Sequence, residues 1–434
     1  MKAELIAHDG EELTIQIKVK ITGSLFETEH LILDACNQVG QLASFYALKQ
    51  FDTDGGPIQV DGVKFTAKGT TPKFYETPYG AVEVSRFVYQ TSQGGKIYCP
   101  LELNARIIQN ATPRFAPQIS HKYSNLNAPA VCRDLEENHH RKIAHSYVQA
   151  VSDWVGGIAS AKEETWEYTT PNLNETAITS VAISLDGAFV LMREYGYREA
   201  MVGAISLYDV NGDRQHSIYI GEAPEYGKAT FIDRLEEEIA KIKKLYPTAT
   251  YLGVADGSKN NWSFLEKHTT QQCLDFFHAT EYLAEVAYAA FPGKTDKPKR
   301  EAWLKERCKQ LKHEVGAIDA IIAEMEIFAK RKKLSKSIQE NLSAAQTYFA
   351  NNRHRMNYSD HLDQNLPIGS GVTEAACKTL VKQRLCCSGM RWKSQGAKVI
   401  LSLRALIQTK GRWQQFWDKV DQFGTQICAQ GTSN

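Results

Sequence analysis

The run TAITSVAISLDGAFV at residues 176–190 decides the fold. It is apolar and rich in β-branched residues, which is typical of a buried strand. Two more apolar runs follow, MVGAISLYDV at 201–210 and QHSIYIGEA at 215–223, and an Asn-Gly-Asp hairpin signal at 211–213 separates them. We therefore expect three strands that form an antiparallel meander.

Helices and strands alternate after this meander. ATFIDRLEEEIAKIKKLY (229–246) has amphipathic helical spacing, and TATYLGVADG (248–257) is typical of a buried strand. NWSFLEKHT (261–269) indicates a short helix, and QQCLDFFHA (271–279) indicates another strand. Three strands, helix, strand, helix, strand is the order of a ribonuclease-H-like core, in which the first and fourth strands are neighbours.

A helix, a short break and a second helix are predicted in APAVCRDLEENHHRKIAHSYVQAVSDWV, at 128–155. This pattern fits a helix-turn-helix DNA-binding unit, and a plain helical hairpin is the alternative. The second helix is expected to run from about Arg141 to Val155. The residues expected on its exposed face, in contact with DNA, are Arg141, Lys142, His145 and Gln149.

Composition and cysteine usage indicate a soluble protein of the cytoplasm. Hydrophobic residues make up 43% of the chain and charged residues 23%. No run of about 18 apolar residues occurs, and the N-terminal residues lack the apolar core of a signal peptide, so no membrane partner is expected. The nine cysteines form no CxxC pair, which disfavours a disulfide framework. His139, His140 and Cys132 lack the spacing of a zinc knuckle, so no metal is expected there.

Charge is distributed unevenly, although the net charge is only +1. Residues 1–290 carry 26 basic and 37 acidic groups, whereas residues 291–434 carry 25 basic and 13 acidic groups. A basic C-terminal third on an acidic body indicates a polyanion partner. The alternative is a pair of solvated helices.

The 434 residues are too many for one core, so a multidomain α/β protein is expected. An all-helical insertion is predicted to interrupt the ribonuclease-H-like core. The predicted boundaries are 1–95 for a small α+β unit, 96–172 for the helical DNA-binding unit and a linker, 173–290 for the first part of the core, 291–362 for the helical insertion, 363–410 for the closing helices of the core and 411–434 for a C-terminal tail. Packing, dimerisation and holding a DNA end stay open as roles of the first unit.

Three acidic residues fall where this fold gathers ligands. Asp186 ends the first run, Asp256 ends the fourth strand, and Glu374 begins the helix after the insertion. Ligands bind beyond the carboxyl ends of such strands. Mg²⁺ prefers carboxylates, and two ions together activate a water or 3′-hydroxyl at a phosphodiester. We therefore predict two Mg²⁺ ions, which Mn²⁺ can replace, on these catalytic residues. The alternative is two turn aspartates and a glutamate favoured by the helix dipole.

Four motifs together resemble the DDE transposases of bacterial insertion sequences: SLDG, VADGSKNNW, DFFHATEYL and GSGVTEAACKTLVKQRLCCSGMRW. The most similar group is the ISKra type, whose catalytic domain is interrupted as in the Mutator and hAT transposases. The resemblance covers about residues 80–410 and implies a triad of Asp186, Asp256 and Glu374. It also implies that Asp275 supports the site and that His278 contacts the scissile phosphate or orders a metal ligand.

Basic residues follow Glu374 along the chain. Lys378 and Lys382 come four and eight residues later, so we expect them on the same helix face and in contact with phosphates. The basic patch is extended by Arg384, Arg391 and Lys393. Trp392 either stacks on an unpaired base or packs between the last two helices.

The predicted function is that of a transposase. It would bind the ends of a mobile element and catalyse metal-dependent phosphodiester hydrolysis and strand transfer into target DNA. Two DNA ends must meet, so a homodimer or larger synaptic oligomer is expected, associated with the nucleoid of a bacterial cell. The alternatives are another ribonuclease-H-like nuclease and a non-enzymatic DNA-binding protein derived from a transposase.

Overall fold

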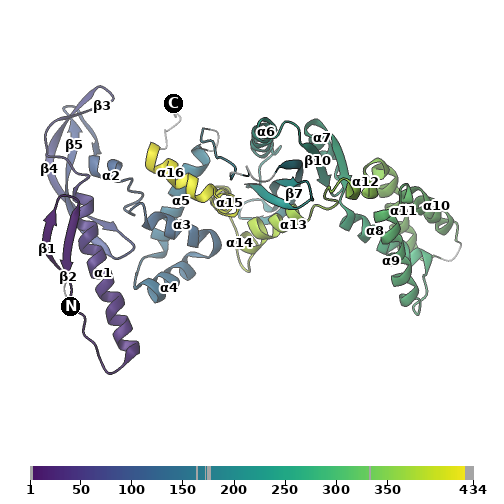
Figure 1. Ribbon diagram of the computed structural model, residues 1–434, viewed down its shortest axis with the longest axis horizontal. Helices are drawn as coiled ribbons and strands as arrows, with labels where there is room; N and C mark the ends of the chain where they lie inside the picture. Colours follow the sequence, from purple (N-terminus) through teal and green to yellow (C-terminus); the bar gives the residue numbers. More distant parts are fainter. Residues whose placement is uncertain (1–2, 163–164, 172, 174–176, 332–333, 426–434) are drawn as a thin grey trace. The chain divides into compact units, whose positions relative to one another are not determined.

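The chain is a multidomain α/β protein, as the sequence predicted. The computed structural model in Figure 1 describes residues 3–162, 165–171, 173, 177–331 and 334–425. Two compact units are formed, the first by Met1–Tyr168, Lys398–Ile407 and Arg412–Asn434, and the second by Thr169–Ala397 and Gln408–Gly411. Residues 163, 164, 172 and 174–176 of the predicted linker and 426–434 of the predicted tail lie outside the described residues.

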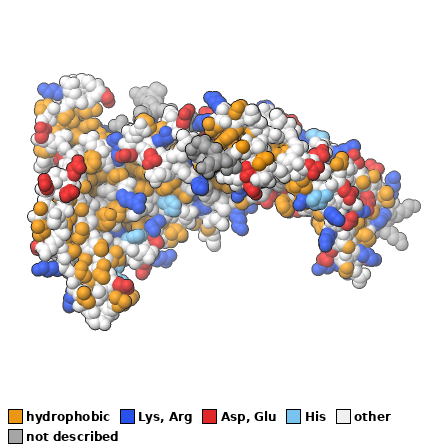
Figure 2. Space-filling view, viewed as in Figure 1, with side chains coloured by type: hydrophobic (Ala, Val, Ile, Leu, Met, Phe, Trp, Pro, Cys, Tyr) orange, Lys and Arg blue, Asp and Glu red, His pale blue; other side chains and the backbone are white. Residues whose placement is uncertain are grey.

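The N-terminal part of the first unit combines a hairpin, a long helix and a sheet. The elements are β1 (Glu4–Asp9), β2 (Glu12–Gln16), α1 (Leu25–Lys49), β3 (Ile58–Val60), β4 (Val63–Glu76), β5 (Ala81–Thr91) and β6 (Gly94–Tyr98). Strands β3 to β6 form an antiparallel sheet in chain order. Helix α1 exposes Leu25, Phe26 and Ile32, and apolar side chains run along its visible face in Figure 2.

Helices complete the first unit. They are α2 (Pro100–Asn104), α3 (Phe115–Asn125), α4 (Ala128–His139), α5 (His145–Lys162), residues 398–407 of α15 (Ser394–Gln408) and α16 (Arg412–Phe423). Helix α16 lies within the predicted tail, and its buried Phe416 and Val420 anchor it to this unit. The predicted break between α4 and α5 is present, and His140 adopts a left-handed conformation there, with φ of 51°.

The second helix of this pair begins at His145, four residues later than the sequence predicted. Arg141 lies in the break and is only 7% exposed. Its Nε donates to the Thr77 carbonyl at 3.0 Å, and its guanidinium pairs with the Glu76 carboxylate. The prediction that Arg141 lies on an exposed DNA-binding face is therefore wrong, because the end of β4 holds it inside. His145, with Lys142 and Gln149, is exposed, and DNA contact by these residues stays a prediction.

The second unit is built on a mixed five-stranded sheet. The strand order is β11 (Gln271–Leu274), β10 (Thr250–Ala255), β7 (Ile178–Met192), β8 (Gly196–Asp209) and β9 (Arg214–Glu222). Strands β7, β8 and β9 form the predicted antiparallel meander, and β10 pairs in parallel with both β7 and β11. Helices α6 (Ala229–Leu245) and α7 (Lys259–His268) precede the two parallel strands, so the predicted order of elements is confirmed.

Helices cover both faces of this sheet (Figure 1). On one face a Cβ added to Gly203 of β8 would meet Leu235 of α6 at 3.2 Å, and one added to Gly253 of β10 would meet Leu265 of α7 at 3.0 Å. On the other face lies α13 (Gly371–Ala376), joined to β7 by a hydrogen bond between the hydroxyls of Ser184 and Thr373. Covering of both faces explains the unbroken burial at residues 200–209 of β8.

A helical segment connects β11 to α13. It contains α8 (Phe276–Ala290), α9 (Lys297–His313), α10 (Ala317–Ala329), α11 (Lys336–Asn352), the 3₁₀ turn η1 (Arg353–Arg355) and α12 (Tyr358–Asp363). The rings of Tyr282 and Tyr348 stack 3.9 Å apart and join α8 to α11. Within 291–331 and 334–362 the structure contains no strand. Across the described parts of the chain, no helix combines the length and apolar character that spanning a membrane requires.

Candidate metal centre

Three aspartates lie at one level of the second sheet. Partners in the β7–β10 ladder are 70 residues apart, and partners in the β10–β11 ladder are 19 apart. Asp186 and Asp256 are also 70 residues apart, and Asp256 and Asp275 are 19 apart. The amide of Asp275 donates to the Ala255 carbonyl at 2.8 Å, which extends the second ladder by one step. The two registers therefore align the three aspartates across the edge where β10 and β11 end.

Asp186 lies inside β7, so the prediction that it ends the first strand is wrong. The antiparallel pairing of β7 with β8 continues to Met192, which pairs with Gly196, whereas β10 stops at Ala255. The hairpin thus extends past the parallel strands. Asp186 and Gly187 interrupt a largely buried run in β7 and are half-buried. The carboxylate of Asp186 consequently stays within reach of solvent at the level where β10 ends.

Asp256 directly follows β10, as predicted. Its Oδ1 accepts a hydrogen bond from the Ser258 amide at 3.1 Å, and its carbonyl accepts one from the Tyr348 hydroxyl at 2.9 Å. Gly257 adopts a φ of 105°, and a Cβ there would lie 2.8 Å from the Tyr348 ring. This position requires glycine, because α11 packs directly against the loop that carries Asp256.

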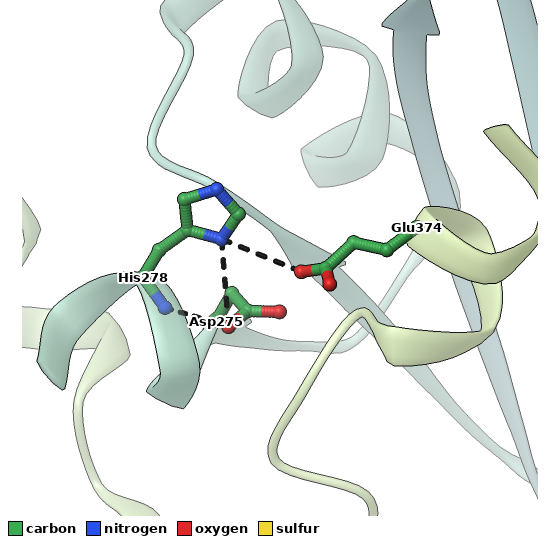
Figure 3. Close-up of side chains that lie close together, drawn as sticks. All are labelled: Asp275, His278 and Glu374. Carbon is green, nitrogen blue, oxygen red and sulfur yellow. Dashed lines mark hydrogen bonds and ion pairs between the residues drawn. The ribbon is translucent and has the colours of Figure 1, made fainter. Parts of the chain in front are cut away.

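Asp275, His278 and Glu374 converge (Figure 3). Asp275 caps α8, where its Oδ1 accepts a hydrogen bond from the His278 amide at 3.0 Å. His278 Nδ1 lies 3.6 Å from Asp275 Oδ1 and 3.6 Å from Glu374 Oε1. One ligand atom of each residue lies within 4.8 Å of the others, a spacing at which one metal ion can be held.

The charges in this group stabilise one another. Contact with the Asp275 carboxylate, opposed by burial and aided by the charges of Glu374 and Glu281, raises the pKa of His278 to about 9. Burial disfavours ionisation of Asp275, but hydrogen bonds with His278 and Ser370 outweigh it and lower the pKa of Asp275 to about 2. At neutral pH without metal, a charged imidazole therefore lies between two carboxylates.

The helix that carries Glu374 is fastened to the sheet on both sides of this residue. Ser370, at the start of α13, donates from its amide and its hydroxyl to Asp275 Oδ2. The predicted capping position of Ser370 is correct, although its hydroxyl bonds the sheet rather than the helix. One turn after Glu374, Cys377 Sγ donates to Asp186 Oδ2 at 3.6 Å. Burial and the Asp186 charge raise the pKa of Cys377, so it acts as a thiol donor.

The predicted triad of Asp186, Asp256 and Glu374 is brought together in part. In the described residues, the ligand atoms within 4.8 Å of one another belong to Glu374 with Asp275 and His278. Asp186 and Asp256 share their level in the sheet and point to the same edge. The sequence motif Asp-x-x-His marked the first pair, but nothing in the sequence marked Ser370 or Cys377, because those contacts exist only once α13 crosses the sheet.

Lys378 and Lys382 belong to η2 (Cys377–Lys382), a π-helical continuation of α13. Short π-helical segments are rare and recur at functional sites. Both lysines are exposed, as are Arg391 and Lys393. Their positions are compatible with the predicted phosphate contacts, which stay predictions.

Arg384 differs from the other members of the predicted basic patch. It is only 2% exposed, in α14 (Gln383–Leu385), and its guanidinium lies 5.1 Å from the centre of the Trp392 ring. The prediction that Arg384 contacts DNA is therefore wrong. The half-buried Trp392 donates its indole N–H to the Leu385 carbonyl at 2.9 Å. Of its two predicted roles, these contacts favour packing.

No protein-family model matches the chain, and no curated protein matches it. The site therefore has to be interpreted from its own chemistry. Four carboxylates and one imidazole gather at a strand edge, beside an exposed pair of lysines, and this combination suits oxygen-binding cations and an anionic substrate.

Proposed function

We propose that this protein is a DDE-type transposase with a ribonuclease-H-like core. It would hydrolyse phosphodiester bonds at the ends of a mobile element and join those ends to target DNA. The observation that carries the proposal is the common level of Asp186, Asp256 and Asp275 at one sheet edge, with the helix of Glu374 fastened across it. Carboxylates in such an arrangement bind divalent cations and serve phosphoryl transfer.

The order of strands supports the choice of fold. A meander whose first strand is flanked by a parallel strand, with a second parallel strand outside it, is the order expected for a ribonuclease-H-like core. The helices α8–α12 separate the strand edge from Glu374 in the chain. This separation agrees with the interrupted catalytic domain that the resemblance implies.

The donor set fits hard cations. Mg²⁺ prefers carboxylate oxygens, and Asp186, Asp256 and Glu374 would hold it, with Mn²⁺ as a substitute. Two bound ions would activate the attacking water or 3′-hydroxyl and stabilise the leaving oxygen. Asp275 and His278 would act as positioning residues, because the imidazole contacts the Glu374 carboxylate and Asp275 holds the imidazole.

The charge distribution supports DNA as the partner. Lys378 and Lys382 are exposed on the helical segment that begins with Glu374, so they would meet phosphates beside the reacting bond. Residues 291–434 carry 25 basic and 13 acidic groups. Recognition of the element ends would fall to α4 and α5 of the first unit, and two copies would be needed to hold two ends.

A strand-transfer assay tests this function. A labelled element end and a supercoiled target plasmid, incubated with Mg²⁺ or Mn²⁺, should give cleaved and joined products, whereas Ca²⁺ should support binding only. Asp186→Asn, Asp256→Asn and Glu374→Gln should each abolish both products and leave end binding intact. Asp363→Asn, at an exposed aspartate of α12, is the matched control and should stay active.

The outcome separates the alternatives. Cleavage without joining would indicate a nuclease, and end binding without cleavage at any metal concentration would indicate a non-enzymatic DNA-binding protein. Cleavage in the presence of a chelator would contradict the metal-dependent mechanism itself.

A further inference from the structure

Two histidines from distant parts of the chain meet in the first unit, away from the carboxylate edge. His30 lies on α1, and His140 lies in the break between α4 and α5. His30 Nδ1 and His140 Nε2 are 3.3 Å apart. The other nitrogen of the second ring, His140 Nδ1, lies 2.8 Å from Oδ1 of Asp34, one turn along α1.

The separation of the two nitrogens matches a metal-binding geometry. Tetrahedral Zn²⁺ with Zn–N bonds of about 2.0–2.1 Å places two imidazole nitrogens about 3.3–3.4 Å apart. A carboxylate on the remote nitrogen of a ligating histidine fixes its tautomer and increases its basicity. Asp34 holds the proton on Nδ1 of His140, so Nε2 presents a lone pair towards His30.

The surroundings hold this geometry in place before any ion binds. The Asn37 side chain of α1 donates to the His139 carbonyl at 3.1 Å, beside His140. His30 is exposed, so an ion can reach the two nitrogens from solvent. The histidines are 110 residues apart in the chain, which is why no zinc motif is visible in the sequence.

We propose that His30 and His140 form a two-histidine clamp for Zn²⁺, with Asp34 as the positioning residue and water in the remaining coordination sites. Imidazole suits Zn²⁺, whereas Mg²⁺ prefers oxygen, so the clamp would select a different ion from the carboxylate edge. The bound ion would join α1 to the break before α5. It would therefore stabilise the first unit at the helix pair predicted to contact DNA.

Zinc titration of the full-length protein tests the clamp. Calorimetry is done in excess Mg²⁺, which occupies the carboxylate edge, after alkylation of the exposed thiols. Zn²⁺ should bind and raise the melting temperature of the first unit. His30→Ala and His140→Asn should remove this binding, and asparagine is chosen at 140 because it tolerates the left-handed conformation. Asp34→Asn should weaken binding about 10- to 100-fold without changing the melting temperature of the metal-free protein.

His139→Ala is the matched control, since it removes a neighbouring imidazole and keeps the carbonyl that Asn37 contacts. It should bind Zn²⁺ as the wild type does. Unchanged zinc binding in His30→Ala, which alters an exposed helix position and leaves the fold intact, would overturn the clamp. Absence of zinc-dependent stabilisation in the wild type would also overturn it and leave a direct hydrogen bond between the rings. Neither readout involves DNA, so failure here would not bear on the proposed transposase activity.

Discussion

The two sheets of this protein are covered differently. In β5 of the first unit, Val82 and Val84 are buried while Glu83 and Ser85 are exposed, so one face meets solvent. In β8 of the second unit, residues 200–209 are all buried, so both faces are covered. A sheet without a free face can offer a ligand only its edges and the loops beyond them.

The difference explains where the charged chemistry lies. In the second unit, apolar side chains occupy the faces, and Asp256 and Asp275 follow directly on β10 and β11. In the first unit, polar side chains are distributed along the open face of a strand, as Glu83 is. The doubly covered sheet thus concentrates polar groups at one edge, while the singly covered sheet spreads them over a surface.

Charges introduced into the two sheets test this comparison with the largest expected effect. Ala204→Glu and Ile205→Glu alter neighbouring positions of β8 that face opposite, covered sides. Each should destabilise the second unit by several kcal/mol, roughly the cost of an unpaired buried charge. In β5, Val84→Glu should be similarly damaging, whereas Ser85→Glu should change the free energy of unfolding by less than about 0.5 kcal/mol. Urea unfolding measures all four, and a tolerated Ala204→Glu would contradict the doubly covered sheet.

Asp275→Asn tests whether charge holds the strand edge together. The carboxylate of Asp275 is the main cause of the raised pKa of His278. In the variant this pKa should fall from about 9 towards the ordinary value of 6.5. Titration of the imidazole by NMR, in metal-free protein, measures the change. A pKa that stayed near its wild-type value would assign the effect to Glu374 instead.

The same substitution should show a defined dependence of stability on pH. The raised pKa of His278 gives a contribution that is full below pH 6.5 and is lost as the pH rises through about 9. The lowered pKa of Asp275 gives a contribution that is full above pH 3.8 and is lost as the pH falls towards about 2. The loss in unfolding free energy on substitution should therefore be largest between about pH 4 and 6.5. We expect roughly 2 kcal/mol, below the value for a fully buried pair, because His278 is partly exposed. A pH-independent loss would contradict the charge pair.

Two glycines with nearly the same backbone conformation separate strain from crowding. Gly257 at the strand edge has φ of 105°, and Gly69 in β4 has φ of 107°. A Cβ at position 257 would lie 2.8 Å from the Tyr348 ring, whereas one at position 69 would meet nothing within 4 Å. Gly69→Ala should cost roughly 1–2 kcal/mol of backbone strain. Gly257→Ala should cost roughly 1 kcal/mol more, because the ring must also move, and should lower DNA cleavage by displacing Asp256. Equal losses of unfolding free energy would show that the loop yields without resistance.

The elements of the second unit were predictable because burial leaves local patterns. Strands covered on both faces are continuous apolar runs, and the meander turn has its own signal. The alignment of Asp186, Asp256 and Asp275 was not predictable, because spacings of 70 and 19 residues acquire meaning only when the paired strands are known. The length of β7 escaped prediction for a related reason, since its last residues are strand only through pairing with β8.

The wrong site predictions concern charged residues that find partners inside the protein. Arg141 was expected to face solvent, but it meets Glu76, which is 65 residues away in the chain. Arg384 was expected to contact DNA, but its guanidinium covers the Trp392 ring. A sequence records a charge and not its partner, so burial of a cation cannot be derived from local periodicity. The contact between His30 and His140 escaped prediction in the same way.

The smallest expected effect concerns the rim of the strand edge. Lys378 and Lys382 are exposed on η2, next to Glu374 in the helix, so they should contact phosphates without distinguishing sequences. Changing both to alanine should weaken binding to all duplexes alike and leave the free energy of unfolding within about 0.5 kcal/mol. Each lost phosphate contact should reduce the slope of log affinity against log salt by about 0.9. Affinity measured by fluorescence anisotropy over a range of salt concentrations gives this slope.

Lys244→Ala is the control for the same measurement. Lys244 is equally exposed, but it lies on α6, across the sheet from α13, and its loss should leave the slope unchanged. The two experiments together locate the DNA path relative to the sheet, because phosphates that follow the carboxylate edge meet η2 and do not meet α6. An unchanged slope in the Lys378 and Lys382 variant would remove η2 from that path. A reduced slope for Lys244→Ala would place DNA along a covered face, and the contrast between an active edge and inert faces would no longer hold.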